Sequence, residues 1–135
     1  MNSFKIKYNG QFRTEAKHLE SGQIINTDAP KDNQGKGEYF SPTDLICVAL
    51  TSCMLTIIAI STKKYNINLS GTSAIVTKKM QSNPRMISDI NIVLTFKENY
   101  EGKLRTIIRR TALNCPVFRS LSSKVNKKVE FKYPS

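Results

Sequence analysis

Apolar and polar side chains alternate over residues 4–8, and the turn-forming pair Asn9-Gly10 follows them. This pattern predicts a strand that enters a β-hairpin. Extended patterns return over residues 11–18 and 23–27, so we expect three strands at the start of the chain. Residues 27–38 are rich in Pro, Gly, Asp and Asn and are predicted to form a loop. A polar loop of this length in a compact domain is more often functional or part of an interface than a shorter one.

A strong helix-start signal follows this loop. Ser41 is the expected N-cap, Pro42 the first helical residue and Asp44 the third, where an acidic side chain suits the helix N-terminus. Residues 45–60 are then apolar on nearly every side. At ~1.5 Å per residue this segment is about 24 Å long, short of a bilayer core of ~30 Å. We therefore expect a buried central helix and no membrane span, with a partner subunit completing its cover.

The second half of the chain alternates between the two periodicities. Period-two patterns predict strands over residues 72–80 and 87–96, and an amphipathic pattern predicts a helix over 102–114. The pair Cys115-Pro116 breaks that helix, with a short helical turn after it, and residues 129–133 close the chain as a strand. The order β-β-β-α-β-β-α-β predicts the α+β class: one domain over residues 1–135, with a long central helix against a largely antiparallel sheet.

The net charge and the number of cysteines indicate which cellular compartment and which partners to expect. The chain has 135 residues with 21 Lys and Arg against 10 Asp and Glu, a net charge of +11. Because the basic residues are spread along the chain, we expect a solvated basic surface and do not expect nucleic acid as a partner. No secretory signal is evident, and three cysteines make a poor disulfide framework. A cytoplasmic protein with free thiols, no metal and no cofactor is the expectation.

The three cysteines differ in their local context. Cys115 precedes Pro116 at a helix start, where backbone N–H groups lower the pKa of a thiol. Cys53 lies within the apolar helix and has no such local help, so only a tertiary neighbour such as an Arg or Lys could make it a thiolate. Cys47 lies about 120° from Cys53 around the helix axis and is expected to be inert.

Three segments carry a resemblance to a known family. The segment GKGEYFSPTDL begins at Gly35, CMLTI follows seven residues later from Cys53, and CPVFRSL begins at Cys115. Together these motifs resemble the OsmC/Ohr family of thiol-dependent peroxidases. Residues 12–33, FRTEAKHLESGQIINTDAPKDN, resemble one branch of OsmC-like proteins. The similarity extends over residues 8–133.

The resemblance implies a fold, a reaction and roles for residues. It implies an intertwined homodimer in which the sheets wrap the central helices. Cys53 matches the peroxidatic cysteine, Cys115 the resolving cysteine, and Arg13 an arginine placed against the thiolate, contributed by the partner chain. The implied activity is reduction of organic hydroperoxides in oxidative-stress defence, with a dithiol reductant that is thioredoxin-like, lipoyl or a small thiol.

Two positions depart from the family pattern. Thr43 stands where the better-characterised peroxidases have Glu, with Asp44 one residue late, and Phe118 stands where related sequences have His, Ala or Ser. Without a carboxylate at residue 43, Arg13 would lose an orienting partner, so slow turnover is expected. The alternative is a catalytically weakened binding or sensing protein that holds a small apolar ligand or an anionic partner. A nucleic-acid-binding protein is a third reading, supported by the net charge alone.

Overall fold

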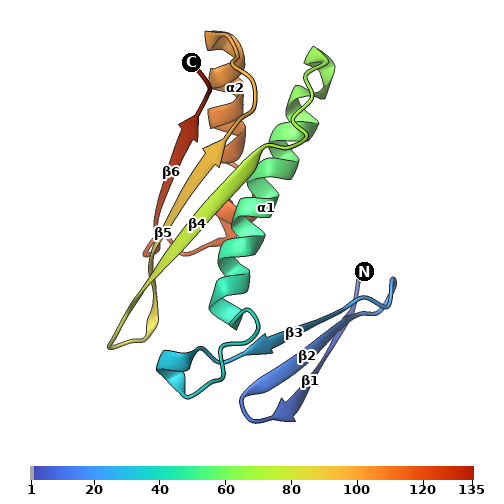
Figure 1. Cartoon of the computed structure of the whole chain (residues 1–135), viewed down its shortest axis with the longest axis vertical. Helices are drawn as coiled ribbons and strands as arrows, with labels where there is room; N and C mark the ends of the chain where they lie inside the picture. The colour runs from blue at the N-terminus through green and yellow to red at the C-terminus, as the bar shows by residue number, and fades with distance from the viewer. Residues whose placement is uncertain (1) are drawn as a thin grey trace. The chain divides into compact units, whose positions relative to one another are not determined.

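The computed structural model describes residues 2–135. Its secondary structure runs β1 (Phe4–Gly10), β2 (Arg13–His18), β3 (Ile24–Asp28), η1 (Lys31–Asn33), α1 (Pro42–Thr62), η2 (Lys63–Tyr65), β4 (Ser73–Gln81), β5 (Met86–Thr95), α2 (Gly102–Ala112), α3 (Pro116–Ser120) and β6 (Asn126–Lys132). Figure 1 shows this order from blue to red. The chain divides into two compact units, Met1–Ile46 and Cys47–Ser135.

The first unit contains a three-stranded antiparallel sheet in the order β1-β2-β3. The tight connection between β1 and β2 places Gln11 and Phe12 at φ values of 54° and 62°, and Gly10 at 86°. In the register between β2 and β3, Arg13 is paired with Asp28. This sheet register, together with the loop after β3, positions the charged side chains described below.

The start of α1 follows the sequence prediction. The backbone N–H of Ser41 donates to Asp44 Oδ2 at 2.9 Å, and the backbone N–H of Asp44 donates to Ser41 Oγ at 3.1 Å. These reciprocal bonds are a capping box, which satisfies backbone donors that a helix N-terminus leaves without partners. The cap and Pro42 together fix where α1 begins.

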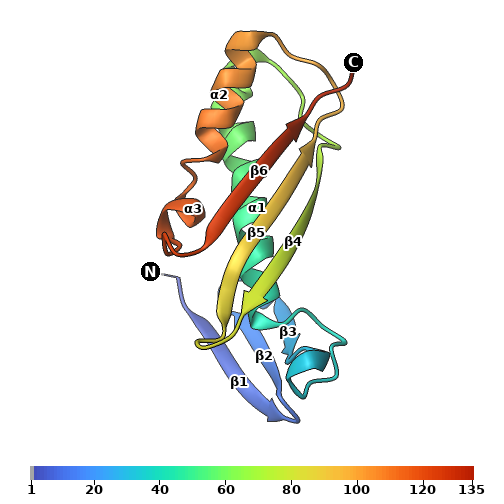
Figure 2. The same cartoon turned by 90° about the vertical axis from the view of Figure 1, so that its left-hand side faces the viewer.

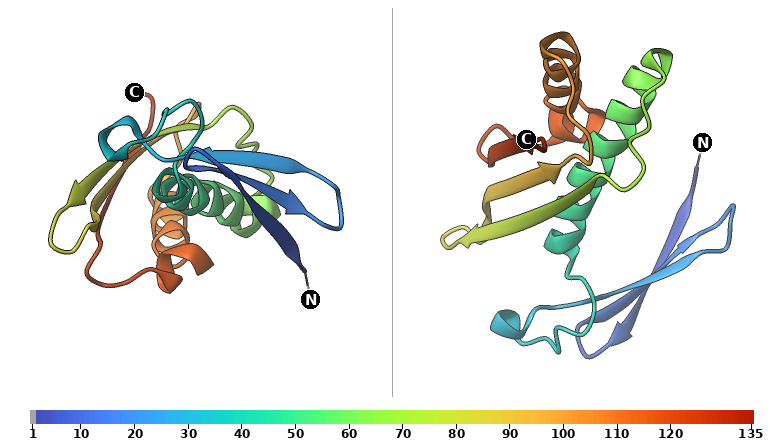
Figure 3. Two further views of the ribbon diagram at one scale, coloured as in Figure 1. Left: turned by 90° about the horizontal axis from the view of Figure 1, so that it is seen from below. Right: turned by 45° about the horizontal axis from the view of Figure 1, so that its top comes forward.

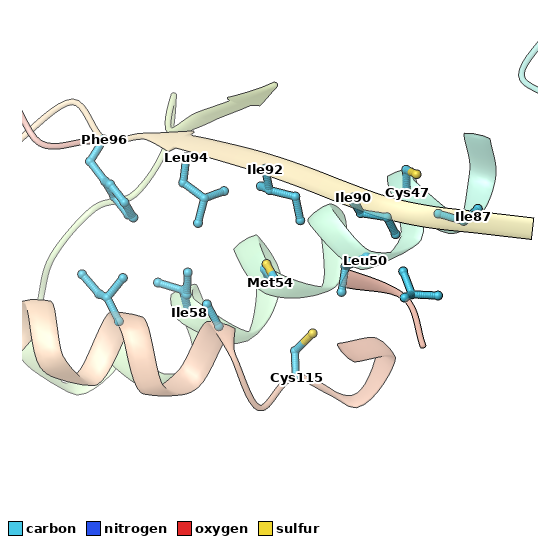
Figure 4. Close-up of a cluster of buried hydrophobic side chains, with 13 residues drawn as sticks. Cys47, Leu50, Met54, Ile58, Ile87, Ile90, Ile92, Leu94, Phe96 and Cys115 are labelled. Carbon is cyan, nitrogen blue, oxygen red and sulfur yellow. The ribbon is translucent and has the colours of Figure 1, made fainter. Parts of the chain in front are cut away.

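The second unit places α1 and α2 on one face of the sheet formed by β4, β5 and β6 (Figures 1 and 2). The two helices lie side by side in further views as well (Figure 3). Fully buried side chains come from α1, β5 and α2 (Figure 4); they include Leu50, Met54, Ile58, Ile90, Ile92, Leu94 and Ile108. Burial of a side chain of this size contributes roughly 1.5–3 kcal/mol, so this cluster anchors the unit.

The predicted order and the α+β class are confirmed, and the structure differs from the prediction in where β6 begins and in how it pairs. The helix α1 has 21 residues and is about 31 Å long at ~1.5 Å per residue, because it extends beyond the apolar segment of residues 45–60 at both ends. The helical segment Pro42–Tyr65, which includes α1, is long and apolar enough to cross a membrane. Within its most apolar 18-residue stretch, 33% is buried. Its packing against β5 supports a core helix. Strand β6 begins at Asn126 and pairs with β5 in parallel, where a largely antiparallel sheet was expected.

Candidate functional site

Two cysteine thiols meet in the second unit. Cys53 lies on α1 and is partly exposed, whereas Cys115 precedes α3 and is fully buried. Both are free thiols. An interaction with the Cys53 thiol contributes to the raised pKa of Cys115, so the two side chains are neighbours in space. The fold thus brings together two cysteines that are 62 residues apart in the sequence, as a disulfide between them would require.

Cys115 occupies the N-cap position of α3, as the sequence predicted. The Cys115 sulfur accepts a hydrogen bond from the backbone N–H of Phe118 at 3.4 Å. Its side chain points from the connection between α2 and α3 toward α1 (Figure 4). Burial raises the pKa of the Cys115 thiol. The backbone N–H of Phe118 lowers it, as predicted, but only in part, so the expected net lowering is wrong. At neutral pH Cys115 is therefore a thiol and not a thiolate.

Cys47 is buried in the apolar core and belongs to a different face of α1 from Cys53. Its backbone carbonyl accepts a hydrogen bond from Thr51 Oγ1 at 2.9 Å. That bond satisfies a polar side chain that is itself buried on the helix. A structural role for Cys47 fits this packing.

Arg13 is held by two carboxylates in the first unit. Its Nε donates to Asp28 Oδ1 at 2.6 Å, its Nη2 donates to Asp28 Oδ2 at 2.9 Å, and Nη2 also donates to Glu38 Oε1 at 2.7 Å. The guanidinium lies over the ring of Tyr39, with Cζ 4.7 Å from the ring centroid. A side-on bidentate pair fixes the plane of the guanidinium as well as its position.

The electrostatics of this pair favour both charged forms. The hydrogen bond from Arg13 is the main cause that lowers the pKa of Asp28 to about 2, although burial of the carboxylate acts in the opposite direction. A backbone N–H of Glu38 also donates to Asp28 Oδ2, at 3.0 Å. The hydrogen bonds to Asp28 and then Glu38 raise the pKa of Arg13. Asp28 is fully buried, whereas the Glu38 side chain is 61% exposed.

The loop after β3 is folded tightly enough to hold these carboxylates. The backbone N–H of Asp28 donates to Phe40 O at 3.1 Å, and that of Gly37 donates to Ala29 O at 3.3 Å. A Cβ on Gly35 would lie 1.7 Å from Ala29 O, which no side chain can tolerate. The predicted functional loop is therefore the backbone frame of the Arg13 site.

The expectation that Arg13 lacks an orienting carboxylate is wrong. Thr43 does not take the place of the missing glutamate: its hydroxyl lies 3.2 Å from Ser41 Oγ, at the start of α1. Asp44 caps the helix, as predicted. Asp28 and Glu38 supply the negative charge that Thr43 lacks. Slow turnover can therefore no longer be argued from Thr43.

Phe118 is the last of the predicted site residues, and three further residues of the site were not predicted. Phe118 contributes its backbone N–H to Cys115, and its ring lies 5.0 Å from Lys127 Nζ. Sequence reasoning missed Asp28, Glu38 and Tyr39. A signal existed for Asp28, because a hairpin that pairs residue 18 with residue 23 also pairs residue 13 with residue 28. Within residues 2–135 there is no group of three or more His, Cys, Asp or Glu that could hold a metal ion.

The comparisons with known proteins agree with this fold. The family model for OsmC-like protein matches residues 35–130, so the chain belongs to the OsmC-like family. No curated protein matches the chain. Among solved structures, a candidate osmotic stress induced and detoxification response protein of Psychrobacter arcticus is 47% identical. The match covers 97% of this chain and 96% of that one, with a TM-score of 0.93.

More distant structures share the fold alone. An OsmC-like protein of Mycoplasma pneumoniae has a TM-score of 0.82 at 18% identity, with 100% of this chain and 98% of that chain covered. An organic hydroperoxide resistance protein of Legionella pneumophila has a TM-score of 0.78 at 13% identity, with 98% and 96% covered. These matches extend over the whole chain and support the OsmC-like α+β architecture.

Proposed function

We propose that this protein is a thiol-dependent peroxidase that reduces organic hydroperoxides in the cytoplasm, with Cys53 as the peroxidatic and Cys115 as the resolving cysteine. The observation that carries the proposal is the pairing of a partly exposed thiol with a buried neighbouring thiol whose pKa is raised. Membership of the OsmC-like family supports a role in redox stress defence. A similar fold in a Legionella pneumophila protein named for organic hydroperoxide resistance supports the choice of substrate class.

The first step is attack by the Cys53 thiolate on the outer oxygen of the hydroperoxide. The S–O bond forms as the O–O bond breaks heterolytically, and the alkoxide takes a proton and leaves as an alcohol. Cys53 is oxidised to a sulfenic acid and the hydroperoxide is reduced by two electrons. The apolar side chains around Cys53 on α1 favour an organic hydroperoxide over well-hydrated hydrogen peroxide.

The second step forms a disulfide. The Cys115 sulfur attacks the Cys53 sulfenic sulfur, the S–O bond breaks, and the hydroxyl leaves as water with the proton of the Cys115 thiol. A raised pKa keeps Cys115 protonated until this step. Because a thiol reacts slowly with peroxide, the two cysteines do not compete for the substrate. A dithiol reductant, thioredoxin-like, lipoyl or a small thiol, returns both residues to the thiol form.

Arg13 is the proposed activating group for the Cys53 thiolate. Its described hydrogen bonds within residues 2–135 use Nε and Nη2, which leaves the two N–H groups of Nη1 for a thiolate or a peroxide oxygen. Asp28 and Glu38 are the proposed positioning residues for the guanidinium. As the family resemblance implies, the Arg13 that serves one Cys53 comes from the partner chain of a homodimer.

The distribution of apolar surface supports that homodimer. Within the described residues 2–46 no hydrophobic side chain is buried, and ten of the twelve exposed large hydrophobic side chains of residues 2–135 lie there. They include Phe4, Ile6 and Tyr8 on alternate positions of β1. A three-stranded sheet needs a covered apolar face to be stable, and a second copy of the chain supplies one in the proposed assembly.

A second candidate is a binding or sensing protein that has lost most of its turnover. The observation in its favour is that Arg13 is bound by two carboxylates. Their combined negative charge exceeds the single positive charge of the guanidinium, which would otherwise stabilise a thiolate. Such a protein would hold a small apolar ligand or an anionic partner at the same site. Turnover measurements separate the two candidates.

The test is consumption of cumene hydroperoxide in the presence of a dithiol. We expect Cys53→Ser to abolish consumption, and Cys115→Ser to allow one reaction per chain without sustained turnover. Cys47→Ser is the matched control on the same helix and should turn over like wild type. Equal turnover by wild type and Cys53→Ser would reject the peroxidase and favour the binding protein.

A further inference from the structure

The net charge of this protein is carried entirely by its second unit. Residues 1–46 contain six Lys and Arg and six Asp and Glu, and are therefore neutral. Residues 47–135 contain 15 Lys and Arg against 4 Asp and Glu, which accounts for the whole net charge of +11. The basic residues are spread along the sequence but segregated in the fold. The peroxidase chemistry proposed above makes no use of this charge.

The segregation is strongest in the last third of the chain. From Gly102 to Lys132 there are nine Lys and Arg and a single carboxylate, Glu130. The 11-residue helix α2 carries four cations and no acidic side chain. Arg105 and Arg109 are four residues apart on it, an arrangement in which like charges repel and destabilise the helix. No acidic side chain within α2 offsets this repulsion, so the helix carries an unbalanced positive charge.

Three of these cations are oriented by aromatic rings. The guanidinium of Arg105 lies 4.2 Å from the Tyr133 ring centroid, and that of Arg109 lies 5.6 Å from the Phe131 centroid. Lys127 Nζ lies 5.0 Å from the Phe118 centroid. We call Arg105, Arg109 and Lys127 the basic face.

The basic face runs along the edge of the second sheet. Residues 127, 131 and 133 share one side of the chain at β6, because side chains in a strand alternate between two faces. Strand β6 is an edge strand, and α2 and α3 lie beside it (Figure 2). At ~3.3 Å per residue, these positions extend over about 20 Å. Cations spread over this length cannot all three converge on one small anion.

Neutral groups hold two of these cations in place and do not neutralise their charge. Arg105 donates to Tyr100 O at 3.0 Å and to Asn99 Oδ1, and Lys127 donates to Val125 O at 2.9 Å. Among residues 2–135, no carboxylate is described within ion-pair distance of the basic face. Arg13 is the contrast within this same chain, since two carboxylates neutralise it. A cation oriented by rings and carbonyls binds an external anion without first breaking an ion pair.

We propose that the basic face binds the phosphodiester backbone of nucleic acid without sequence preference. A duplex carries one negative charge per ~1.7 Å of axis, which suits a row of cations about 20 Å long. The three rings are covered by the cations, so they offer no free platform for stacked bases, and contact is with phosphates. None of the exposed large hydrophobic side chains of residues 2–135 lies beyond Ile75. The face therefore lacks the apolar anchors that binding to a membrane surface uses.

The test is fluorescence anisotropy of two labelled 25-base-pair duplexes of unrelated sequence, titrated with the full-length protein between 50 and 200 mM KCl. Both duplexes should bind equally. Three phosphate contacts predict an affinity loss of about 40-fold across that range. The triple variant Arg105→Gln/Arg109→Gln/Lys127→Gln should bind at least tenfold more weakly at 50 mM KCl, with a salt slope smaller by about 3.

The matched control removes the same charge elsewhere. The variant Lys5→Gln/Lys7→Gln/Lys36→Gln has the same net charge as the first triple variant, and it should bind DNA like wild type. An equal loss in both variants would overturn the proposal, because net charge and not the basic face would then govern binding. Binding of polyglutamate or of phosphatidylserine vesicles that is as tight as DNA binding at equal charge concentration would also overturn the proposal. The proposal predicts no change in the circular dichroism spectrum or in hydroperoxide turnover of the first triple variant. Both measurements therefore report whether that variant is folded.

Discussion

Arg13 and Asp28 face each other across the register of β2 and β3 and form a bidentate ion pair, with N–O distances of 2.6 and 2.9 Å. The Asp28 carboxylate is fully buried, and the exposed Glu38 side chain accepts a further hydrogen bond from Arg13. The carboxylates that hold Arg13 thus come from the sheet and from the loop that follows it, and not from the start of α1.

The buried pair predicts a dependence of stability on acid. Because pairing with Arg13 lowers the pKa of Asp28 from 3.8 to about 2, the ionised carboxylate stabilises the folded state above pH 4. That contribution is lost as pH falls from about 4 through about 2. We expect the free energy of unfolding of wild type to fall more steeply over this window than that of Asp28→Asn, measured by urea denaturation. Equal slopes for the two proteins would show that Asp28 does not carry the effect.

The two carboxylates should have opposite effects on the rate of Cys53 oxidation. Asp28→Asn removes the bidentate partner that orients Arg13, and a misplaced catalytic group costs about 10–100-fold in rate. Glu38→Gln removes an exposed negative charge near the proposed thiolate while Asp28 still orients the guanidinium, so the rate should rise by ~2–5-fold.

Stopped-flow measurement of Cys53 oxidation by cumene hydroperoxide compares these variants with Arg13→Ala, which should be nearly inactive. The neutral Gln side chain keeps the size of Glu38, so a change in rate reports its charge. Should Arg13→Ala react as fast as wild type, Arg13 is not the activating group. Thr43→Glu should have little effect, because Arg13 already has two carboxylate partners.

The uncovered apolar surface of residues 2–46 predicts an obligate dimer. Obligate interfaces bury on the order of 2,000 Å² or more. Sedimentation of wild type at low micromolar concentration should give a species of twice the 15.2 kDa chain mass. Ile6→Glu places a charge on the exposed face of β1 and should weaken that dimer, whereas Lys7→Glu, on the next residue of the same strand, should not. A folded wild-type monomer of 15.2 kDa would contradict the proposed assembly.

Local signals were sufficient to predict most of the fold. The capping box at Ser41 and Asp44 and the period-two pattern of β5 each depend on neighbours in sequence, so both were visible without a structure. The parallel pairing of β6 with β5 was not, because it depends on how the α2–α3 connection crosses the sheet. The apolar run over residues 45–60 is shorter than α1 because residues 42–44 and 61–62, which are polar or small, also belong to the helix.

The site was harder to predict, for a physical reason. The N-cap position of Cys115 was visible in the pair Cys115-Pro116, but its burial was not, and burial decides the direction of its pKa. Glu38 reaches Arg13 only because the loop after β3 folds back through backbone hydrogen bonds of Asp28 and Gly37. The resemblance of the motifs around Cys53 and Cys115 to the OsmC/Ohr family singled out the two cysteines, but the partners of Arg13 depend on tertiary structure.

The most direct test of the central claim is mass spectrometry of the peptides formed after one equivalent of cumene hydroperoxide is added to the reduced protein. The account predicts a disulfide between Cys53 and Cys115, with Cys47 remaining a free thiol. In Cys115→Ser, the same treatment should leave Cys53 as sulfenic or sulfinic acid. A disulfide that includes Cys47, or oxidation of Cys115 before Cys53, would contradict the assignment of the two cysteines.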